Sequence, residues 1–301
     1  GVDDGPPTIR RSIVLAEGLR PHRVGLQFPL VGVGMDSGHV RVHDVRTGTE
    51  VAALDAPKPF EDTCAWMVLW GGPRQLFALY GRAAVAEWNG EVGADGKLEF
   101  GFRAVHQLGL GDEVAAEFGL AADIFFLSYA RGWLAACFDN GTCSIYDVEK
   151  CKLLRHQLCH YECTSRINFD GERFVSIDFK GGIQVANVLE DGSIKHVNAT
   201  VLPDMAKGMC RWLHYIAVYV CDHDEWDKAI QILDLRTLRV VHYFPFAVQS
   251  TARSNNCALW FDGNRIMFVS GADDDDDDPI GIGNSGGMLQ TLELHPKTKP
   301  R

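Results

Sequence analysis

The sequence has no long apolar run, and no stretch approaches the roughly 18 residues that a transmembrane helix needs. Residues 1–12 (GVDDGPPTIRRS) lack an apolar core after their charges, so they do not resemble a secretory signal peptide. The nine cysteines are odd in number and mostly fall in strand-like segments, which indicates reduced thiols rather than a disulfide framework. We therefore expect a cytoplasmic or nuclear protein that does not bind membranes.

Basic charge is also scarce. The chain has 29 Lys and Arg against 40 Asp and Glu, which gives a formal net charge of −11. The run Asp273–Asp278 carries six of these charges, and without it the charge is −11 + 6 = −5. A surface for nucleic acid or anionic lipid needs clustered Lys and Arg, which this composition does not offer. We expect protein partners and no nucleic acid.

What the sequence does contain is a short phrase that recurs along its length. A turn residue is followed five or six positions later by a hydrophobic residue and Asp, or by a similar pair. Between the turn and the pair, apolar and polar residues alternate with the period of a half-buried strand. The pairs recur at steps of about 40 to 58 residues, near the period of a propeller blade. The copies read GHVRVHDV (38–45), AAVAEWNG (83–90), GTCSIYDV (141–148), GGIQVANV (181–188), KAIQILDL (228–235) and GMLQTLEL (287–294).

Two strand-like runs precede each pair and one follows it, which predicts an all-β chain of four-stranded blades. The last blade lacks a fourth strand, and a strand expected at residues 8–18 would complete it and close the ring. The sequence therefore predicts a single β-propeller domain over residues 1–301, with six blades and seven as the alternative. The blades are placed at residues 23–56, 63–108, 122–160, 163–202, 208–246 and 253–296.

These copies are similar to degenerate repeats of the WD40 family, although Kelch-like and other propellers stay open as alternatives. The resemblance rests on the turns Asp36-Ser-Gly38, Asp139-Asn-Gly141 and Asp178-Phe-Lys-Gly181, and on the pair that replaces Trp-Asp. The Gly-His dipeptide that precedes each blade in that family is absent, so the sequence does not predict the family's buried His–Asp hydrogen bond. The resemblance implies a non-catalytic scaffold for protein interactions, or a subunit of a larger complex, with no cofactor.

Two acidic loops form the candidate binding face. In a WD40-like blade, the loops between the second and third strands emerge on one face, and these two belong to the neighbouring fifth and sixth blades. Their ten acidic side chains around a Trp predict a basic protein partner, because complementary charge gives specificity and aromatic residues anchor interfaces. The alternative is that Trp226 folds back on its own blade and the acids only aid solubility. The residues are Asp222, Asp224, Glu225, Trp226 and Asp227 in one loop, and Asp273, Asp274, Asp275, Asp276, Asp277 and Asp278 in the other.

Other motifs are interpreted as structural. The GxGxxG pattern at residues 281–286 follows six aspartates that would repel phosphates, and a strand rather than a helix comes after it. Six adjacent carboxylates cannot all converge on one calcium ion. One group of soft ligands could suggest zinc, but it lacks a second close Cys pair and is interpreted as structural thiols. That group is Cys151, His156, Cys159, His160 and Cys163.

Two further hypotheses place the function elsewhere. An enzyme or small-ligand binder would use the central channel, where the innermost strands offer Arg166, Arg211 and His214 but no repeating set of carboxylates. A structural subunit would instead turn apolar outer strands toward a neighbour. The strands at 98–105 (LEFGFRAV) and 239–246 (RVVHYFPF) are the ones to examine for that role.

Overall fold

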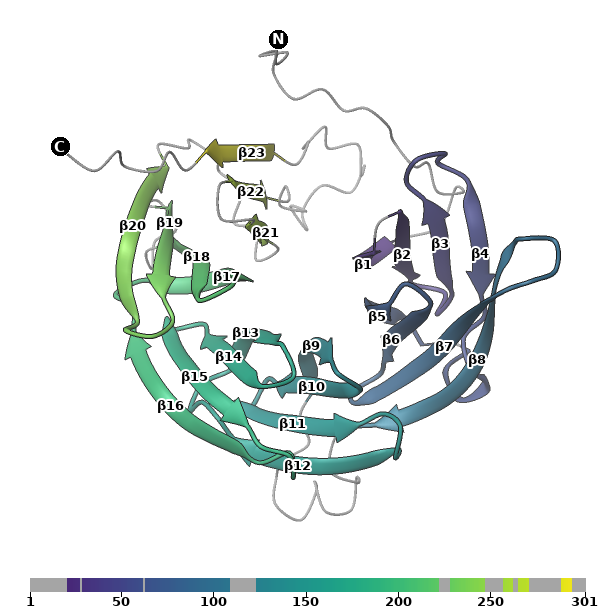
Figure 1. Ribbon diagram of the computed structural model, residues 1–301, viewed down its shortest axis with the longest axis horizontal. Helices are drawn as coiled ribbons and strands as arrows, with labels where there is room; N and C mark the ends of the chain where they lie inside the picture. Colours follow the sequence, from purple (N-terminus) through teal and green to yellow (C-terminus); the bar gives the residue numbers. More distant parts are fainter. Residues whose placement is uncertain are drawn as a thin grey trace, which may run out of the picture. The chain divides into compact units, whose positions relative to one another are not determined.

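The computed structural model describes residues 21–27, 29–61, 63–108, 123–221, 228–246, 257–261, 265–270 and 288–293 (Figure 1). These residues form antiparallel β-sheets, five with four strands and one with three, and a single short 3-10 helix at Lys58–Phe60. The all-β class and the four-stranded, blade-like sheets that the sequence predicts are therefore confirmed.

The chain divides into two compact units, one of residues 1–123 and 146–153 and the other of residues 124–145 and 154–301. In the first unit, two complete sheets follow the chain order of their strands, and β1 lies beside β5. The strands are β1 (Pro21–Gln27), β2 (Leu30–Met35), β3 (Val40–Asp44), β4 (Glu50–Leu54), β5 (Ala65–Gly72), β6 (Gln75–Tyr80), β7 (Ala84–Val92) and β8 (Leu98–Gln107).

The second unit contains most of the third sheet and the sheets that follow it, and β9, β13, β17 and β21 lie beside one another in succession. The third sheet consists of β9 (Ile124–Ala130), β10 (Trp133–Phe138), β11 (Thr142–Asp147) and β12 (Lys152–Leu158). The remaining strands are β13 (Thr164–Phe169), β14 (Arg173–Asp178), β15 (Gly182–Val188), β16 (Ile194–Val201), β17 (Met205–Trp212), β18 (Tyr215–Cys221), β19 (Lys228–Asp234), β20 (Arg239–Phe246), β21 (Cys257–Phe261), β22 (Arg265–Ser270) and β23 (Met288–Glu293).

Burial follows the position of a strand within its sheet. The second strands, such as β10 (WLAACF) and β18 (YIAVYVC), are buried at almost every residue after the first, which explains their near-continuous apolar sequences. The fourth strands are exposed or half-buried at almost every residue, as in β12 (KLLRHQL) and β16 (IKHVNATV). Each fully buried aliphatic or aromatic side chain contributes about 1.5–3 kcal/mol to stability, so the second strands supply much of the core energy.

The turn between the second and third strands of a sheet requires glycine. Gly38 has φ +80°, a left-handed conformation that side chains other than glycine's rarely adopt. A Cβ atom at this position would lie 2.7 Å from the carbonyl oxygen of Thr63, which is too close. The Tyr80 hydroxyl donates a hydrogen bond to the Gly38 carbonyl at 2.7 Å and ties the turn to the next sheet. Gly141 and Gly181 adopt the same backbone conformation in the corresponding turns.

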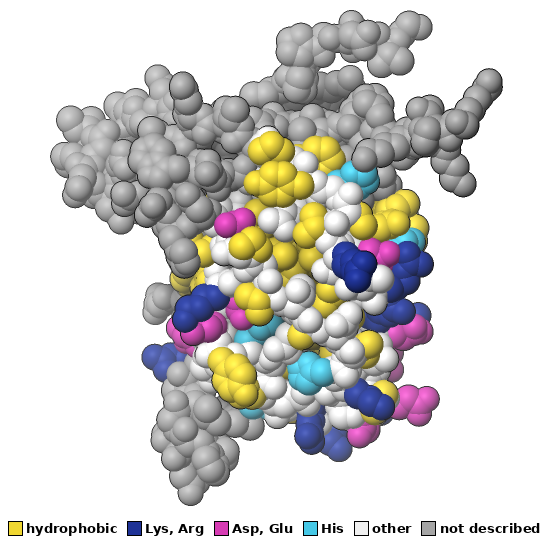
Figure 2. All heavy atoms as spheres, turned by 90° about the vertical axis from the view of Figure 1, so that its left-hand side faces the viewer, with side chains coloured by type: hydrophobic (Ala, Val, Ile, Leu, Met, Phe, Trp, Pro, Cys, Tyr) yellow, Lys and Arg dark blue, Asp and Glu magenta, His cyan; other side chains and the backbone are white. Residues whose placement is uncertain are grey.

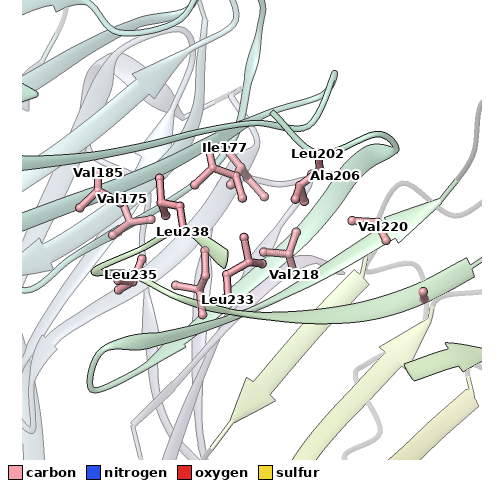
Figure 3. Packing of buried hydrophobic residues seen from close by; sticks show 13 residues of the cluster. Val175, Ile177, Val185, Leu202, Ala206, Val218, Val220, Leu233, Leu235 and Leu238 are labelled. Atoms are coloured by element: carbon pink, nitrogen blue, oxygen red, sulfur yellow. The ribbon is translucent and has the colours of Figure 1, made fainter. Parts of the chain in front are cut away.

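Hydrophobic side chains fill the space between successive sheets. In the first unit, Trp70 packs in the core between the two sheets, and its indole N–H donates to the Gly25 carbonyl at 2.9 Å. In the second unit, Val175 and Ile177 of β14 face Val218 of β18 and Leu233 of β19, as Figure 3 shows. Because such layers of side chains repeat between blades in a propeller, the packing fits the predicted architecture.

One strand boundary differs from the prediction. The sequence run CRWLHYIAVYVC predicts one strand over residues 210–215 and the next over 216–221, whereas β17 already begins at Met205 and ends at Trp212. The turn falls at Leu213 and His214, with Leu213 at φ +53°. No Gly, Pro, Asn or Asp marks this turn in the sequence, so turn chemistry could not locate it.

Several predictions on the ends of the chain stay predictions. The closing strand at residues 8–18 lies outside the described residues, and so does the chain on either side of β23. The closure of the ring, the number of blades and the single domain over residues 1–301 therefore stay untested.

Candidate functional site

The aspartates of the repeated pairs cap the turn between the third and fourth strands. Asp44 Oδ1 accepts the backbone N–H of Arg46 at 2.7 Å, and its Oδ2 accepts the guanidinium of the same Arg46 at 2.6 Å. Asp234 makes the same two bonds with Arg236, at 2.9 and 2.6 Å. The hydrogen bonds from these arginine side chains lower the pKa of each carboxyl group to about 2. The aspartate of the phrase is thus a structural turn residue.

The third copy makes the same turn with lysine. The backbone N–H of Lys150 donates to Asp147 Oδ1 at 3.0 Å, and its ammonium group donates to Oδ2 at 2.7 Å. Burial acts to raise the pKa of Asp147, but these bonds and the Lys150 charge outweigh it and hold the pKa below its usual range. In these three copies, a basic residue two or three positions after the aspartate therefore completes the turn.

In the five pairs whose side chains the structure describes, the residue before the Asp or Asn is buried. His43, Trp88, Tyr146, Ala186 and Leu233 all occupy this position. His43 is the unusual one, because neither of its ring nitrogens has a hydrogen-bond partner among the described residues. Burial lowers its pKa, the charge of Glu50 opposes this shift and the charge of Arg41 adds to it. His43 therefore packs in the core as a neutral side chain.

A buried His–Asp hydrogen bond, which the sequence does not predict, is present before the fourth sheet. His160 lies in the loop between β12 and β13, and its Nδ1 is 3.1 Å from Asp178 Oδ2, while its Nε2 is 2.7 Å from the Ser176 hydroxyl. Asp178 Oδ1 also accepts the Gly182 N–H at 2.7 Å. Burial acts to raise the pKa of Asp178, but the hydrogen bonds from His160 and Gly182 outweigh it and hold the pKa below its usual range. The sequence signal was hidden because Cys159, not glycine, precedes the histidine.

A second buried polar network lies in the second sheet. Glu87 on β7 and His106 on β8 are both fully buried, and His106 Nε2 is 2.8 Å from Glu87 Oε2. Glu87 Oε1 accepts hydrogen bonds from Gln75 at 2.8 Å and Arg103 at 2.9 Å. The other ring nitrogen of His106 lies 3.4 Å from the Tyr146 hydroxyl. Sequence reasoning missed this network, because its members are dispersed over β6, β7, β8 and β11.

Glu87 has the surroundings of a structural carboxylate, because both of its oxygen atoms are hydrogen-bonded to side chains of the protein. Burial acts to raise the pKa of Glu87, but the hydrogen bonds from His106, Gln75 and Arg103 outweigh it and hold the pKa below its usual range. A buried charge is tolerated only when it is paired and hydrogen-bonded, as this one is. The network therefore fixes three strands of the sheet relative to one another.

The predicted acidic face lies outside the described residues. The described strands locate only the ends of its loops: one loop joins Cys221 of β18 to Lys228 of β19, and the other joins Ser270 of β22 to Met288 of β23. Both loops therefore join the second and third strands of their sheets. The two sheets are neighbours, because β17 and β18 both contact β21. The binding role of the acidic residues stays a prediction.

The Cys and His residues that could suggest a zinc site (residues 151–163) make separate contacts with other residues. His156 Nδ1 bonds to the Ser144 hydroxyl at 2.8 Å, His160 bonds to Asp178, and Cys151 is exposed. Within the described part of the chain, no group of three or more His, Cys, Asp or Glu side chains is arranged to hold a metal ion.

The three residues of the central-channel alternative make structural contacts. The guanidinium of Arg166 lies 4.9 Å from the centre of the Phe126 ring, and Arg211 pairs with Asp170 at 2.7 Å. His214 packs against the next residue in the chain, with ring centres 4.1 Å apart. Arg166 and Arg211 thus connect successive sheets of the second unit.

The outer strand of the fifth sheet carries exposed apolar side chains. On β20, Val240, Val241 and Tyr243 are 45, 44 and 55% exposed. Figure 2 shows hydrophobic side chains gathered on the upper part of the face that carries β20, with charged side chains mainly toward its borders. Phe102 on β8, the other strand singled out in the sequence, is also exposed. Within the described residues, no helix has the length and hydrophobicity that a membrane span requires.

Comparison with known proteins identifies the fold. No protein-family model matches the sequence, and no curated protein matches it. The structure is similar to the β-propeller domain of Cps50 (Swd1) from Myceliophteria thermophila, with 8% identity, a TM-score of 0.65, and 91% of this chain and 83% of that chain covered. It is also similar to a chain of the Mitotic Checkpoint Complex, with 13% identity, a TM-score of 0.66, and 94% and 79% covered.

A designed protein has a similar fold as well. The computationally designed Ika8 protein matches with 15% identity, a TM-score of 0.61, and 91% of this chain and 71% of that chain covered. Together these likenesses show that the chain has the fold of WD40 β-propeller proteins. Proteins with this fold are commonly interaction scaffolds and usually non-catalytic.

Proposed function

We propose that the protein is a non-catalytic scaffold that binds other proteins as a subunit of a larger complex. The observation that carries the proposal is the exposed apolar surface of β20, defined by Val240, Val241 and Tyr243. Contiguous exposed apolar side chains on a soluble protein mark sites of protein contact, and Tyr is enriched at such sites. That a similar fold occurs in a chain of the Mitotic Checkpoint Complex supports protein partners in general.

The position of β20 strengthens this argument. It is the last strand of its sheet in the order β17-β18-β19-β20, and residues 240–246 contain no Asp, Glu, Lys or Arg. Edge strands are usually protected from pairing with another chain by charged residues or by proline. In residues 240–246, Pro245 is the only residue of these kinds. A surface that lacks this protection is suited to be covered by a partner.

The acidic loops are proposed as a second binding surface of the same scaffold. Their ten carboxylates would attract a basic peptide or protein, and Trp226 would anchor it. This surface differs from the β20 surface in its salt dependence, because exposed charges are screened at high ionic strength and apolar contacts are not. The two surfaces can therefore be distinguished in one experiment.

The test is an affinity purification in which bound proteins are quantified for the intact chain and for matched variants. Val241→Lys with Tyr243→Ser disrupts the β20 surface, and Val92→Lys places the same charge at another exposed valine as the control. We expect the double variant to lose at least one partner that the control keeps. A variant without Asp273–Asp278 that carries Trp226→Ala should lose a basic partner that the intact chain holds at low salt.

Each half of the proposal can fail separately. If the double variant and its control retain the same proteins, β20 is not a binding surface. If removal of the acidic residues leaves the low-salt partners unchanged, those residues serve solubility. If no variant changes any partner, the scaffold function proposed for these surfaces is wrong.

A further inference from the structure

Three cysteine thiols meet in the core between the third and fourth sheets. Cys137 on β10 and Cys143 on β11 are fully buried, and their sulfur atoms are 2.8 Å apart. Cys143 also makes a thiol hydrogen bond with Cys159, which is buried just after β12. The surroundings are apolar and include Ile145, Ile167 and other members of one core cluster.

The backbone holds the Cys137 and Cys143 thiols together. Their strands are neighbours in the sheet and are joined by a tight turn, in which the Gly141 N–H donates to the Phe138 carbonyl at 3.1 Å. The Cys159 N–H donates to the Gly141 carbonyl at 3.0 Å, which fixes the loop after β12 against the same turn. These backbone bonds keep the two cysteine residues close together in the fold.

The separation of the two sulfur atoms, 2.8 Å, lies between a disulfide bond and an ordinary non-bonded contact. A disulfide bond is about 2.05 Å long, whereas non-bonded heavy atoms prefer about 3.5–4.0 Å. Strands that are neighbours in a sheet lie about 4.7–4.9 Å apart, which falls within the Cα separations that disulfides span. Small rotations of the two side chains are therefore sufficient to form the bond.

We propose that Cys137 and Cys143 are a redox pair that a hydroperoxide converts into a disulfide between β10 and β11. One thiol is first oxidised by the peroxide to a sulfenic acid, which releases one water molecule. The second thiol attacks that sulfur, the S–S bond forms, and the sulfenic oxygen leaves as a second water molecule. In total, two thiols and one hydrogen peroxide give one disulfide and two waters, and a dithiol reductant reverses the change.

Burial sets the rate and the selectivity of this reaction. Burial raises the pKa of Cys137 and Cys143 above the ordinary value of a thiol, so little thiolate is present at neutral pH and the reaction is slow. Hydrogen peroxide is small and uncharged, which favours it over bulky oxidants at a buried site. Cys151 is exposed, and it provides an internal comparison for a thiol that has no such partner placed against it.

The chain allows a direct test, because trypsin cleaves after Arg131 and Lys150. The peptide 132–150 then contains Cys137 and Cys143 and no other cysteine, while Cys159 and Cys163 fall in the peptide 156–166. The folded chain is treated with hydrogen peroxide, quenched with catalase, denatured, alkylated, digested and analysed by mass spectrometry. We expect peptide 132–150 to appear without alkyl groups and two hydrogen masses lighter than its dithiol form. Prior reduction with dithiothreitol should restore both alkyl groups.

Three variants and the unfolded chain serve as controls for the assignment of the disulfide. Cys137→Ser and Cys143→Ser should each abolish the lighter peptide, and Cys151→Ser should leave it unchanged. Oxidation of the urea-unfolded chain should give mixed pairings, which would attribute the selectivity to the fold. Because the main result comes from the unmodified chain, it does not depend on whether a serine variant folds.

Other outcomes would overturn the proposal. One is a peptide 132–150 that keeps both alkylated thiols under conditions that oxidise Cys151. Another is a disulfide that joins peptide 132–150 to peptide 156–166, which would assign the pairing to Cys159 or Cys163 instead. A third is oxidation of Cys137 or Cys143 to the sulfinic acid without any disulfide.

Discussion

Replacing Glu87 by alanine should strongly destabilise the second sheet. The substitution removes the acceptor of three hydrogen bonds and leaves His106, Gln75 and Arg103 without it. Removal of one partner from a buried charged network costs about 3–5 kcal/mol, because a fully buried polar group, here His106, loses its charged partner and stays desolvated. The chain has seven Trp residues, so the urea midpoint can be followed by intrinsic fluorescence. A loss below about 1 kcal/mol at pH 7 would refute the structural role of the network.

The pH dependence gives a second, independent reading of the same network. The folded-state pKa of Glu87 is below its ordinary value of 4.5, so the ionised form is stabilised by folding. This contribution is fully present above pH 4.5 and is lost as the pH falls through the folded-state pKa. The stability difference between the unaltered chain and Glu87→Gln should therefore shrink below about pH 4.5. Glu99→Ala, an exposed change on β8, should stay within about 0.5 kcal/mol at every pH.

Three further predictions concern single positions. His160→Ala should cost about 1.5–3 kcal/mol in urea unfolding, the range for hydrogen bonds to charged groups, while the exposed His196→Ala should cost almost nothing. Gly38→Ala should cost at least about 1–2 kcal/mol for its left-handed backbone, and equal stability of Gly38→Ala and Gly101→Ala, which has open space, would contradict this. The pKa of His43 is lowered in the folded state, so the unfolded state takes up protons first and stability falls as the pH drops below 6.5. His43→Phe should weaken that fall in a comparison of thermal midpoints at pH 7.5 and 5.5.

Most of the strands could be predicted from the sequence, because local pattern determines them. The run RFVSIDF, for example, predicts a strand at 173–179, and β14 occupies residues 173–178. Glycine at the turns and the apolar–polar alternation before each pair recur in several copies, and each copy independently predicts a turn followed by a strand. The β17–β18 turn could not be located, because Leu213 and His214 are not turn formers and the turn is imposed by the pairing of the two strands.

The polar networks could not be predicted, because they depend on contacts between distant parts of the chain. Glu87 and Tyr146 belong to repeated phrases in which only the alternation is visible, and nothing local shows that both side chains reach His106. His160 appears in the sequence as one of several soft ligands, and only the fold shows that Ser176 and Asp178 occupy both of its nitrogens. The acidic loops were visible as composition, and their binding role stays a prediction.

The construction of the third-to-fourth strand turn has a consequence for how such repeats diverge over evolution. In three copies its geometry is set by an aspartate and a basic residue shortly after it, while the preceding buried position holds His43, Tyr146 or Leu233. Mutation can therefore exchange the bulky residue of a copy, one blade at a time, without losing the turn. A propeller can drift in this way until its repeats share almost no identity, and ancestry then survives in the backbone alone.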